Sequence, residues 1–212
     1  MGTGRFIVLE GIDGAGTTTQ TALLAKRLKA DGATVRTTRE PSDGPVGTMI
    51  RQVLTGRIVG AGGLAPGWQT MALLFAADRM DHVETEITPF VQSGGVIISD
   101  RYDASSLAYQ SVSSGRGGEA AVDWIRSLNA HARRPDLTIV INVPSEIGAA
   151  RREARGEAVQ MYEQNEVQRA LAVFYSDLAR HMPKDDVAIV DGGGSVDAVA
   201  AAVHAIYTKR FP

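Results

Sequence analysis

Five short apolar runs recur along the chain, and longer segments of mixed polarity separate them. Runs of this length are typical of buried strands. The longer segments have the spacing of amphipathic helices, and the alternation of the two predicts a parallel α/β sheet covered by helices. The predicted strands are 6–9, 34–38, 96–99, 137–143 and 187–190. The predicted helices are 17–31, 45–54, 68–91, 119–132, 145–155, 163–181 and 195–207.

Two segments lack a periodic pattern and are predicted to be loops. Residues 56–67 are rich in glycine and alanine, and residues 111–118 are rich in serine and glycine. Neither segment reads as a domain boundary, because the strands on both sides are needed for one sheet. We therefore expect a single domain over residues 1–212.

Composition narrows the classes of function. The 212 residues are 44% hydrophobic with a net charge of −2, so the chain can bury a full core but has no global basic field. We expect no nucleic-acid partner, and no membrane partner because no apolar run reaches the length of a membrane span. The sequence has no cysteine, which fits a reducing, cytoplasmic setting. The histidines show no metal-ligand spacing and are expected to be ordinary surface or core residues: His82, His131, His181 and His204.

Residues 9–20, LEGIDGAGTTTQ, follow the first apolar run. They fit the phosphate-binding pattern of Gly, four residues, Gly, Lys and Ser or Thr through Gly11, Gly16 and Thr18, but Thr17 replaces the lysine. Glycines bring backbone N–H groups close to an anion, and a helix N-terminus adds its dipole. The loop alone leaves a plain glycine-rich turn as an alternative. The predicted ATP-binding residues are Gly11, Ile12, Asp13, Gly14, Ala15, Gly16, Thr17, Thr18 and Thr19.

A lysine elsewhere cannot take over the role of the missing one. Lys26 lies nine residues beyond Thr17 on the predicted helix, about 13 Å away at 1.5 Å per residue. We therefore expect an arginine to supply the replacement charge, with a planar fork of donors instead of a compact ammonium group.

An acid and a base follow the apolar run 96–99. Asp100 and Arg101 come at the carboxyl end of a predicted buried strand, where α/β sheets gather ligands. Asp100, together with the hydroxyl of Thr18, can hold Mg²⁺, and Arg101 can bind a phosphate. Taken alone, the Asp-Arg pair could equally be a structural salt bridge.

Five stretches together resemble the thymidylate kinases, P-loop nucleoside monophosphate kinases that phosphorylate dTMP. They occur in the family's order and span nearly the whole chain. The resemblance implies a three-layer P-loop NTPase fold, with a five-stranded parallel sheet flanked by helices and a short helical lid at about 148–163. The matching stretches are 6–20, 38–41 (TREP), 73–79 (LLFAADR), 100–110 (DRYDASSLAYQ) and 155–163.

The resemblance also implies roles in binding dTMP. Phe75 would stack on thymine, Arg79 would donate to a thymine carbonyl, and Ser106 would contact the base. Tyr109 would lie against the sugar and disfavour a 2′-hydroxyl. Packing roles remain open for two of these, because Phe75 could be a core residue and Tyr109 a half-buried helix residue. The full predicted set is Asp13, Arg39, Arg51, Phe75, Arg79, Arg101, Ser105, Ser106, Tyr109 and Gln110.

A catalytic cation is expected from the lid. Members of the resembling family carry this arginine either in the phosphate loop or in the lid, and the loop position here is Gly14. An arginine-rich segment could also be a solvated helix face, but with this loop a lid is favoured. A second cation common in the family is replaced by Met161. The predicted catalytic residues are Asp13, Arg101, Arg151 and Arg155, of which Arg155 is preferred for the lid and Arg152 is a neighbour.

The resemblance implies transfer of a phosphoryl group from ATP to dTMP, giving ADP and dTDP for dTTP synthesis. It also implies Mg²⁺ as cofactor and a homodimer. Two alternatives stay open. One is a dTMP-binding relative with weak or no catalysis because of Thr17 and Met161, and the other is a kinase for a different acceptor such as dUMP.

Overall fold

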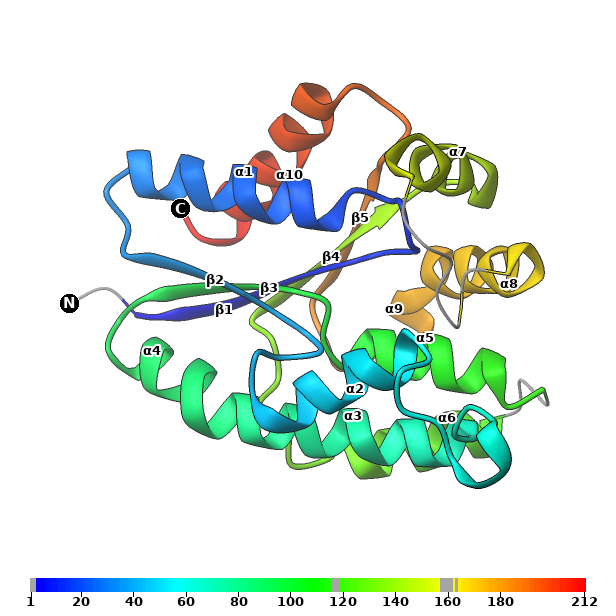
Figure 1. Ribbon diagram of the computed structural model, residues 1–212. Coiled ribbons are helices and arrows are strands. Elements are labelled where there is room, and N and C mark those ends of the chain that lie inside the picture. Colours follow the sequence, from blue (N-terminus) through cyan, green and yellow to red (C-terminus); the bar gives the residue numbers. More distant parts are fainter. Residues whose placement is uncertain (1–2, 116–118, 157–161, 163) are drawn as a thin grey trace.

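The computed structural model describes residues 3–115, 119–156, 162 and 164–212, without the side chain of Arg155. One parallel sheet runs through its centre, with strand order β2-β3-β1-β4-β5 (Figure 1). This confirms the predicted five-stranded parallel sheet. The strands are β1 Arg5–Glu10, β2 Val35–Arg39, β3 Val96–Asp100, β4 Leu137–Asn142 and β5 Val187–Asp191.

Helices cover both faces of the sheet and make three layers (Figure 1). On one face lie α1 Thr17–Ala30 and α10 Val196–Arg210. On the other face lie α2 Pro45–Leu54, α3 Trp68–His82, α4 Thr88–Gln92, α5 Asp103–Ser113 and α6 Glu119–Leu128. Beside the end of the sheet where β1 leads into α1 lie α7 Ser145–Arg155, α8 Asn165–Ser176 and α9 Leu178–His181.

The middle strands carry the core. β1 and β3 pair with Leu9 opposite Asp100, and β1 pairs with β4 on its other side. Their side chains Ile7, Ile98 and Ile139 are fully buried. Apolar residues covered on both faces are the reason why these strands read as continuous apolar runs and not as alternating ones. The carboxyl ends of β1 and β3 therefore lie side by side, and the loops that follow them meet there.

Several predicted boundaries were wrong. α5 was not predicted, and residues 111–113 belong to it and not to a loop. The predicted helix 68–91 is three consecutive pieces, since a π-helical turn at Val83–Ile87 separates α3 from α4. The predicted helix 163–181 is divided into α8 and α9, and the predicted helix 119–132 ends at Leu128. The loop 56–67 contains a short 3₁₀ turn, Ala61–Gly63. Within the described ranges, no helix is long and apolar enough to cross a membrane.

Candidate active site

The phosphate loop joins β1 to the first turn of α1. Gly14 and Gly16 have left-handed φ values of 86° and 98°, which a side chain would strain. α1 begins at Thr17 with no side-chain cap and no acidic residue in its first turn. Its N-terminal N–H groups are therefore free to face an anion, as expected for a loop that holds phosphate.

Thr18 and Asp100 meet beside this loop, as the sequence predicted. The Thr18 hydroxyl donates to Asp100 Oδ2 at 2.5 Å. The second carboxylate oxygen, Oδ1, is buried and has no partner among the described residues. Nowhere in the described part of the chain do three or more His, Asp or Glu side chains gather as a metal site. Two oxygen ligands and an unpaired carboxylate oxygen fit Mg²⁺, which keeps waters and substrate phosphates as its other ligands.

Arg101 ties the loop after β3 to the phosphate loop. Its backbone has φ 73°, the one left-handed non-glycine residue among those described. Its Nη2 donates to Asp13 Oδ1 at 2.7 Å, and its Nη1 donates to the Gly11 carbonyl at 2.9 Å and to Ser105 Oγ at 3.2 Å. Gln168 Nε2 donates to the other oxygen of Asp13 at 2.8 Å. A strained backbone held by this many contacts is typical of a functional position.

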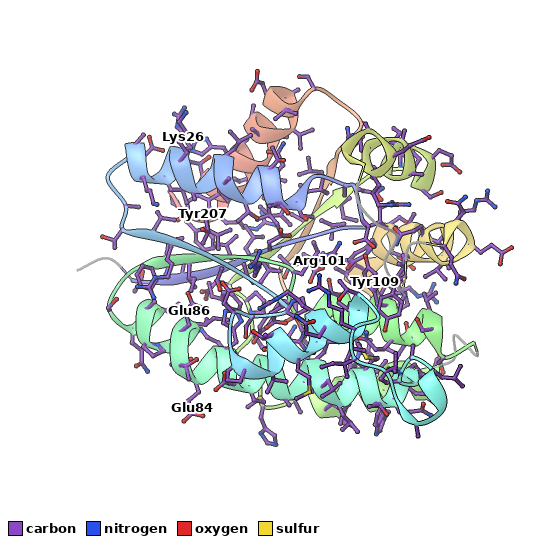
Figure 2. All side chains as sticks on the ribbon, viewed as in Figure 1. Lys26, Glu84, Glu86, Arg101, Tyr109 and Tyr207 are labelled. Atoms are coloured by element: carbon purple, nitrogen blue, oxygen red, sulfur yellow. The ribbon has the colours of Figure 1, made fainter. Side chains whose placement is uncertain are left out.

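The guanidinium group of Arg101 also faces Tyr109. The Arg101 Cζ lies 5.2 Å from the centroid of the Tyr109 ring, and Figure 2 shows the two side chains next to each other at this end of the sheet. Burial disfavours the charged form of Arg101, but Tyr109 and Asp13 outweigh burial and raise its pKa. Burial raises the pKa of the Tyr109 hydroxyl, so this side chain is a neutral phenol at physiological pH.

Glu10 supports both groups from below. Its Oε1 accepts from the backbone N–H groups of Tyr102 and Ser105 at 2.8 and 3.1 Å. Its Oε2 accepts from the hydroxyls of Ser105 and Tyr175 at 2.7 and 2.9 Å. Complete burial raises the pKa of Glu10 to about 7, in spite of the nearby charge of Arg101 and these hydrogen bonds. Glu10 thus fixes the first turn of α5 and the position of Ser105, a supporting role that the sequence also suggested.

A cavity of about 150 Å³ opens between α3, α5 and the phosphate loop. Eight of the ten residues predicted to bind dTMP line it: Asp13, Phe75, Arg79, Arg101, Ser105, Ser106, Tyr109 and Gln110. Five further residues complete the lining: Glu40, Pro41, Leu54, Tyr102 and Tyr162. The fold therefore gathers at one place residues that lie far apart in the sequence.

Arg79 is more completely held than the sequence suggested. It is 1% exposed, and its Nη1 donates to Asn129 Oδ1 at 2.5 Å. Its Nη2 donates to Glu40 Oε2 at 2.6 Å, and to the Tyr102 carbonyl and Ser106 Oγ at 3.1 Å each. The expectation that a ligand must supply its polar partner is therefore corrected, because the protein supplies those partners itself.

Arg39 and Arg51 do not line this cavity. The side chain of Arg39 is 61% exposed and pairs with Asp43 at 2.8 Å. Arg51 Nη1 donates to the carbonyls of Pro41 and Ser42 at 2.9 and 2.5 Å, and so supports the loop that forms one wall. A role for either arginine in binding the acceptor phosphate stays a prediction.

A second cavity, of about 320 Å³, lies on the outer side of the phosphate loop against α7 and the start of α10. Arg151 on α7 lines it and donates to the carbonyls of Ala15 and Gly192 at 3.2 and 3.0 Å. Arg152 donates to the Asp13 carbonyl at 2.6 Å. Neither arginine forms an ion pair with a described residue. The side chain of Arg155 and all of Met161 lie outside the described residues.

Two glycines allow α7 to lie directly on the phosphate loop. A Cβ atom added to Gly14 would overlap the carbonyl oxygen of Gly148, and a Cβ atom added to Gly148 would lie 2.7 Å from the Asp13 carbonyl oxygen. An arginine at position 14 does not fit this arrangement. The cations near the loop therefore come from α7, as predicted for this segment.

Sequence reasoning missed several residues of the site. Gln168 and Tyr175, seven residues apart on one face of α8, hold Asp13 and Glu10. Asn129 and Glu40 hold Arg79. Glu40 lies inside the TREP stretch, so that stretch could have indicated it. The others have no local signal, because their partners are distant in the sequence.

Comparisons with known proteins agree with this geometry. The family model described as thymidylate kinase matches residues 9–203. A probable thymidylate kinase from Pyrococcus abyssi is 39% identical over 96% of this chain and 95% of its own length. The thymidylate kinase of Caulobacter vibrioides is 37% identical over 98% of both chains, and that of Thermomicrobium roseum is 39% identical over 96% of this chain and 94% of its own. Each match spans both cavities and the sheet between them, and the chain belongs to the thymidylate kinase family.

Proposed function

We propose that this protein transfers the γ-phosphoryl group of ATP to dTMP, giving ADP and dTDP. The observation that carries the proposal is the cavity lined by Phe75, Arg79, Ser106 and Tyr109, which opens beside a phosphate loop in a chain of the thymidylate kinase family. An aromatic face, a fixed arginine and a small hydroxyl suit a pyrimidine base. Tyr109 beside the sugar disfavours a 2′-hydroxyl.

ATP occupies the phosphate loop and the adjoining cavity. Its phosphates accept from the backbone N–H groups of residues 11–19, and its base lies toward α10 in the cavity that Arg151 lines. Arg151 and Arg152 have only carbonyl oxygens as partners among the described residues, so their charges are not neutralised by carboxylates. Together with Arg155, they supply the positive charge that Thr17 does not.

Mg²⁺ is held by Thr18 and Asp100, whose oxygen atoms already lie together. When bound, the ion neutralises phosphate charge and bridges phosphate oxygens. Arg101 and Asp13 face the acceptor, where Arg101 binds its phosphate and Asp13 orients the sugar and phosphate end of dTMP. Arg39 and Arg51 guide the acceptor phosphate from the neighbouring loop.

The chain's own contribution is position and charge. The two cavities lie on opposite sides of the phosphate loop, so acceptor and donor phosphates approach each other in line across it. No covalent enzyme intermediate is needed. The lid segment at about 148–163 closes over ATP, which places the arginines of α7 on the transferring group and excludes the water that would hydrolyse it.

We also propose a homodimer in the cytoplasm. Met49 on α2 and Leu73 and Met80 on α3 are large apolar side chains that are 46%, 52% and 38% exposed, and the two helices pack against each other. An exposed apolar surface of this kind suits a second copy of the chain. Light scattering should give twice the chain mass, and Leu73→Glu should reduce it to one chain. A monomeric native protein would contradict the dimer.

The deciding measurement is ADP formation with Mg²⁺ and ATP on native protein and on Thr17→Lys. The acceptors are dTMP, dUMP, thymidine ribonucleotide monophosphate, dCMP, dGMP and AMP. We expect rapid turnover of dTMP alone in the native protein, because arginines replace the lysine. If native protein binds dTMP but forms no ADP, and Thr17→Lys restores it, the chain is a binding relative and not a kinase.

A further inference from the structure

A second layer of charged side chains lies behind Arg79, away from the acceptor cavity. Glu40 holds Arg79 through Oε2, and its other oxygen, Oε1, lies 3.3 Å from His82 Nδ1. His82 Nε2 lies 2.7 Å from Thr38 Oγ1 and 3.3 Å from Glu86 Oε2. The side chain of His82 is 1% exposed, so these contacts are not shared with solvent.

The partners of His82 decide where its protons lie. Nδ1 faces a carboxylate oxygen of Glu40, which pairs with Arg79, is therefore ionised and can only accept. Nε2 faces Glu86 Oε2 and Thr38 Oγ1, and the single Thr38 hydroxyl proton is donated to Glu86 at 3.1 Å. Nε2 must therefore donate as well. Both ring nitrogens carry hydrogen, which makes His82 an imidazolium.

The charges around His82 favour the same state. Burial lowers the pKa of His82, but the hydrogen bond to Glu40 and the charges of Glu40, Glu86 and Asp78 outweigh burial and raise it above 6.5. The positive charge of Arg79 opposes protonation, although Glu40 lies between the two cations. The titratable and charged groups that face this cluster are Glu40, Asp43, Asp78, Arg79, Glu86 and, through Glu86, Arg36.

We propose that His82 is a positioning residue for base recognition: as an imidazolium it orients Glu40, which in turn fixes Arg79 against the base pocket. This inference rests on the proposed function, since it takes thymine as the group that Arg79 meets. His82 does not line the acceptor cavity, so its effect passes through Glu40. Deprotonation removes one donor to Glu40 or Glu86 and loosens the carboxylate that holds Arg79. Binding of the thymine base therefore weakens as pH rises through the pKa of His82.

The first experiment reads the protonation of His82 directly. In protein labelled with ¹⁵N-histidine, long-range ¹H–¹⁵N spectra distinguish an imidazolium from either neutral tautomer, and His82→Gln assigns the signals. Two protonated nitrogens at neutral pH are expected. One protonated nitrogen there would overturn the proposal. This arm needs no ligand, so it stands apart from the question of kinase activity.

Two neighbouring glutamates offer a matched pair of variants. Glu86 lies between the helices and the sheet, whereas Glu84 points away from the sheet (Figure 2). Glu86→Gln should lower the pH at which His82 loses its proton, and Glu84→Gln should leave that pH unchanged. Equal effects of the two variants would contradict the geometry described above.

The second experiment measures the dissociation constant of thymidine, which has no phosphate group to titrate. Between about pH 6 and about pH 8.5, below the titration of the base, we expect about tenfold weaker binding in native protein, the lower end of the effect of losing a hydrogen bond to a charged group. His82→Gln should abolish this pH dependence, and His131→Gln, on the exposed turn after α6, should keep it. The same pH dependence in His82→Gln would overturn the positioning role. No binding of thymidine at any pH would refute the acceptor site itself, and the positioning role with it.

Discussion

The two sides of the phosphate loop are built on different principles. On the acceptor side, each described cation that lines the cavity is paired with a carboxylate, Arg79 with Glu40 and Arg101 with Asp13. On the donor side, Arg151 and Arg152 bond only to backbone carbonyls among the described residues. One side has its charges balanced before any ligand arrives, and the other keeps unbalanced positive charge.

This difference teaches where each side obtains its selectivity. A balanced, buried network fixes side chains and recognises shape and hydrogen bonding, because it has little free charge to attract any anion. Unbalanced arginines attract phosphate strongly and discriminate little. Replacement of a cation should therefore affect stability on the acceptor side and turnover on the donor side.

The largest effect is expected for Arg79→Met. Removing the arginine leaves the Glu40 carboxylate buried without a counterion, which should lower the free energy of unfolding by about 3–5 kcal/mol. Urea denaturation measures it. The double variant Arg79→Met with Glu40→Gln should recover part of this loss. If the single variant loses less than about 1 kcal/mol, the acceptor side is not held by its charge network.

Arg151→Met should reduce turnover about 10²- to 10³-fold, the cost of removing one group that stabilises transition-state charge. The free energy of unfolding should change by less than about 1 kcal/mol, because only two carbonyl contacts are lost. Steady-state kinetics and urea denaturation on one preparation test both parts. Arg180→Met, at a side chain that is 82% exposed, is the matched control. A stability loss as large as that of Arg79→Met would remove the contrast between the two sides.

Gly14→Ala tests the contact between the phosphate loop and α7. Alanine at a left-handed φ costs about 1 kcal/mol, and the overlap with Gly148 should bring the loss of stability to about 2 kcal/mol or more. Gly32→Ala is the control, since Gly32 has φ 90° but no atom within 4 Å of an added Cβ. Equal losses in the two variants would mean that α7 moves away at no cost.

The smallest effect concerns pH. The pKa of Glu10 is raised from 4.5 to about 7, so its contribution to stability is full below 4.5 and is lost as pH rises through about 7. His82, whose pKa is also raised, acts in the same direction. Asp43, whose pKa is lowered, acts in the opposite direction at acid pH.

The free energy of unfolding should therefore be about 1 kcal/mol lower at pH 8 than at pH 6. Urea denaturation at the two pH values measures this difference. Glu10→Gln should reduce it, whereas Glu84→Gln should not. A native protein that is more stable at pH 8 would show that these buried groups do not govern the balance.

The sequence predicted the sheet well and α5 not at all, and both results have the same cause. Strands such as β1 and β4 are covered on both faces, and they appear as apolar runs. α5 is buried on nearly all sides, including Asp103, Ser106 and Gln110, so no polar face gives it a helical period. Burial that makes a strand visible in the sequence hides a helix.

The site divides along similar lines. Residues within matching stretches, such as Phe75, Arg101 and Tyr109, were predicted, and they line one cavity. The groups that hold them were not, because Gln168 meets Asp13 across 155 positions and Asn129 meets Arg79 across 50. A single sequence carries no signal for pairs that only the fold brings together.

The contact between Gly14 and Gly148 also limits how this protein can change over evolutionary time. A first mutation that gave position 14 a side chain would collide with α7 before any benefit of a new cation appeared. A change at Gly148 alone would press on the Asp13 carbonyl. The route from a lid-borne to a loop-borne arginine therefore crosses a fitness valley, and the two glycines hold each other in place across generations.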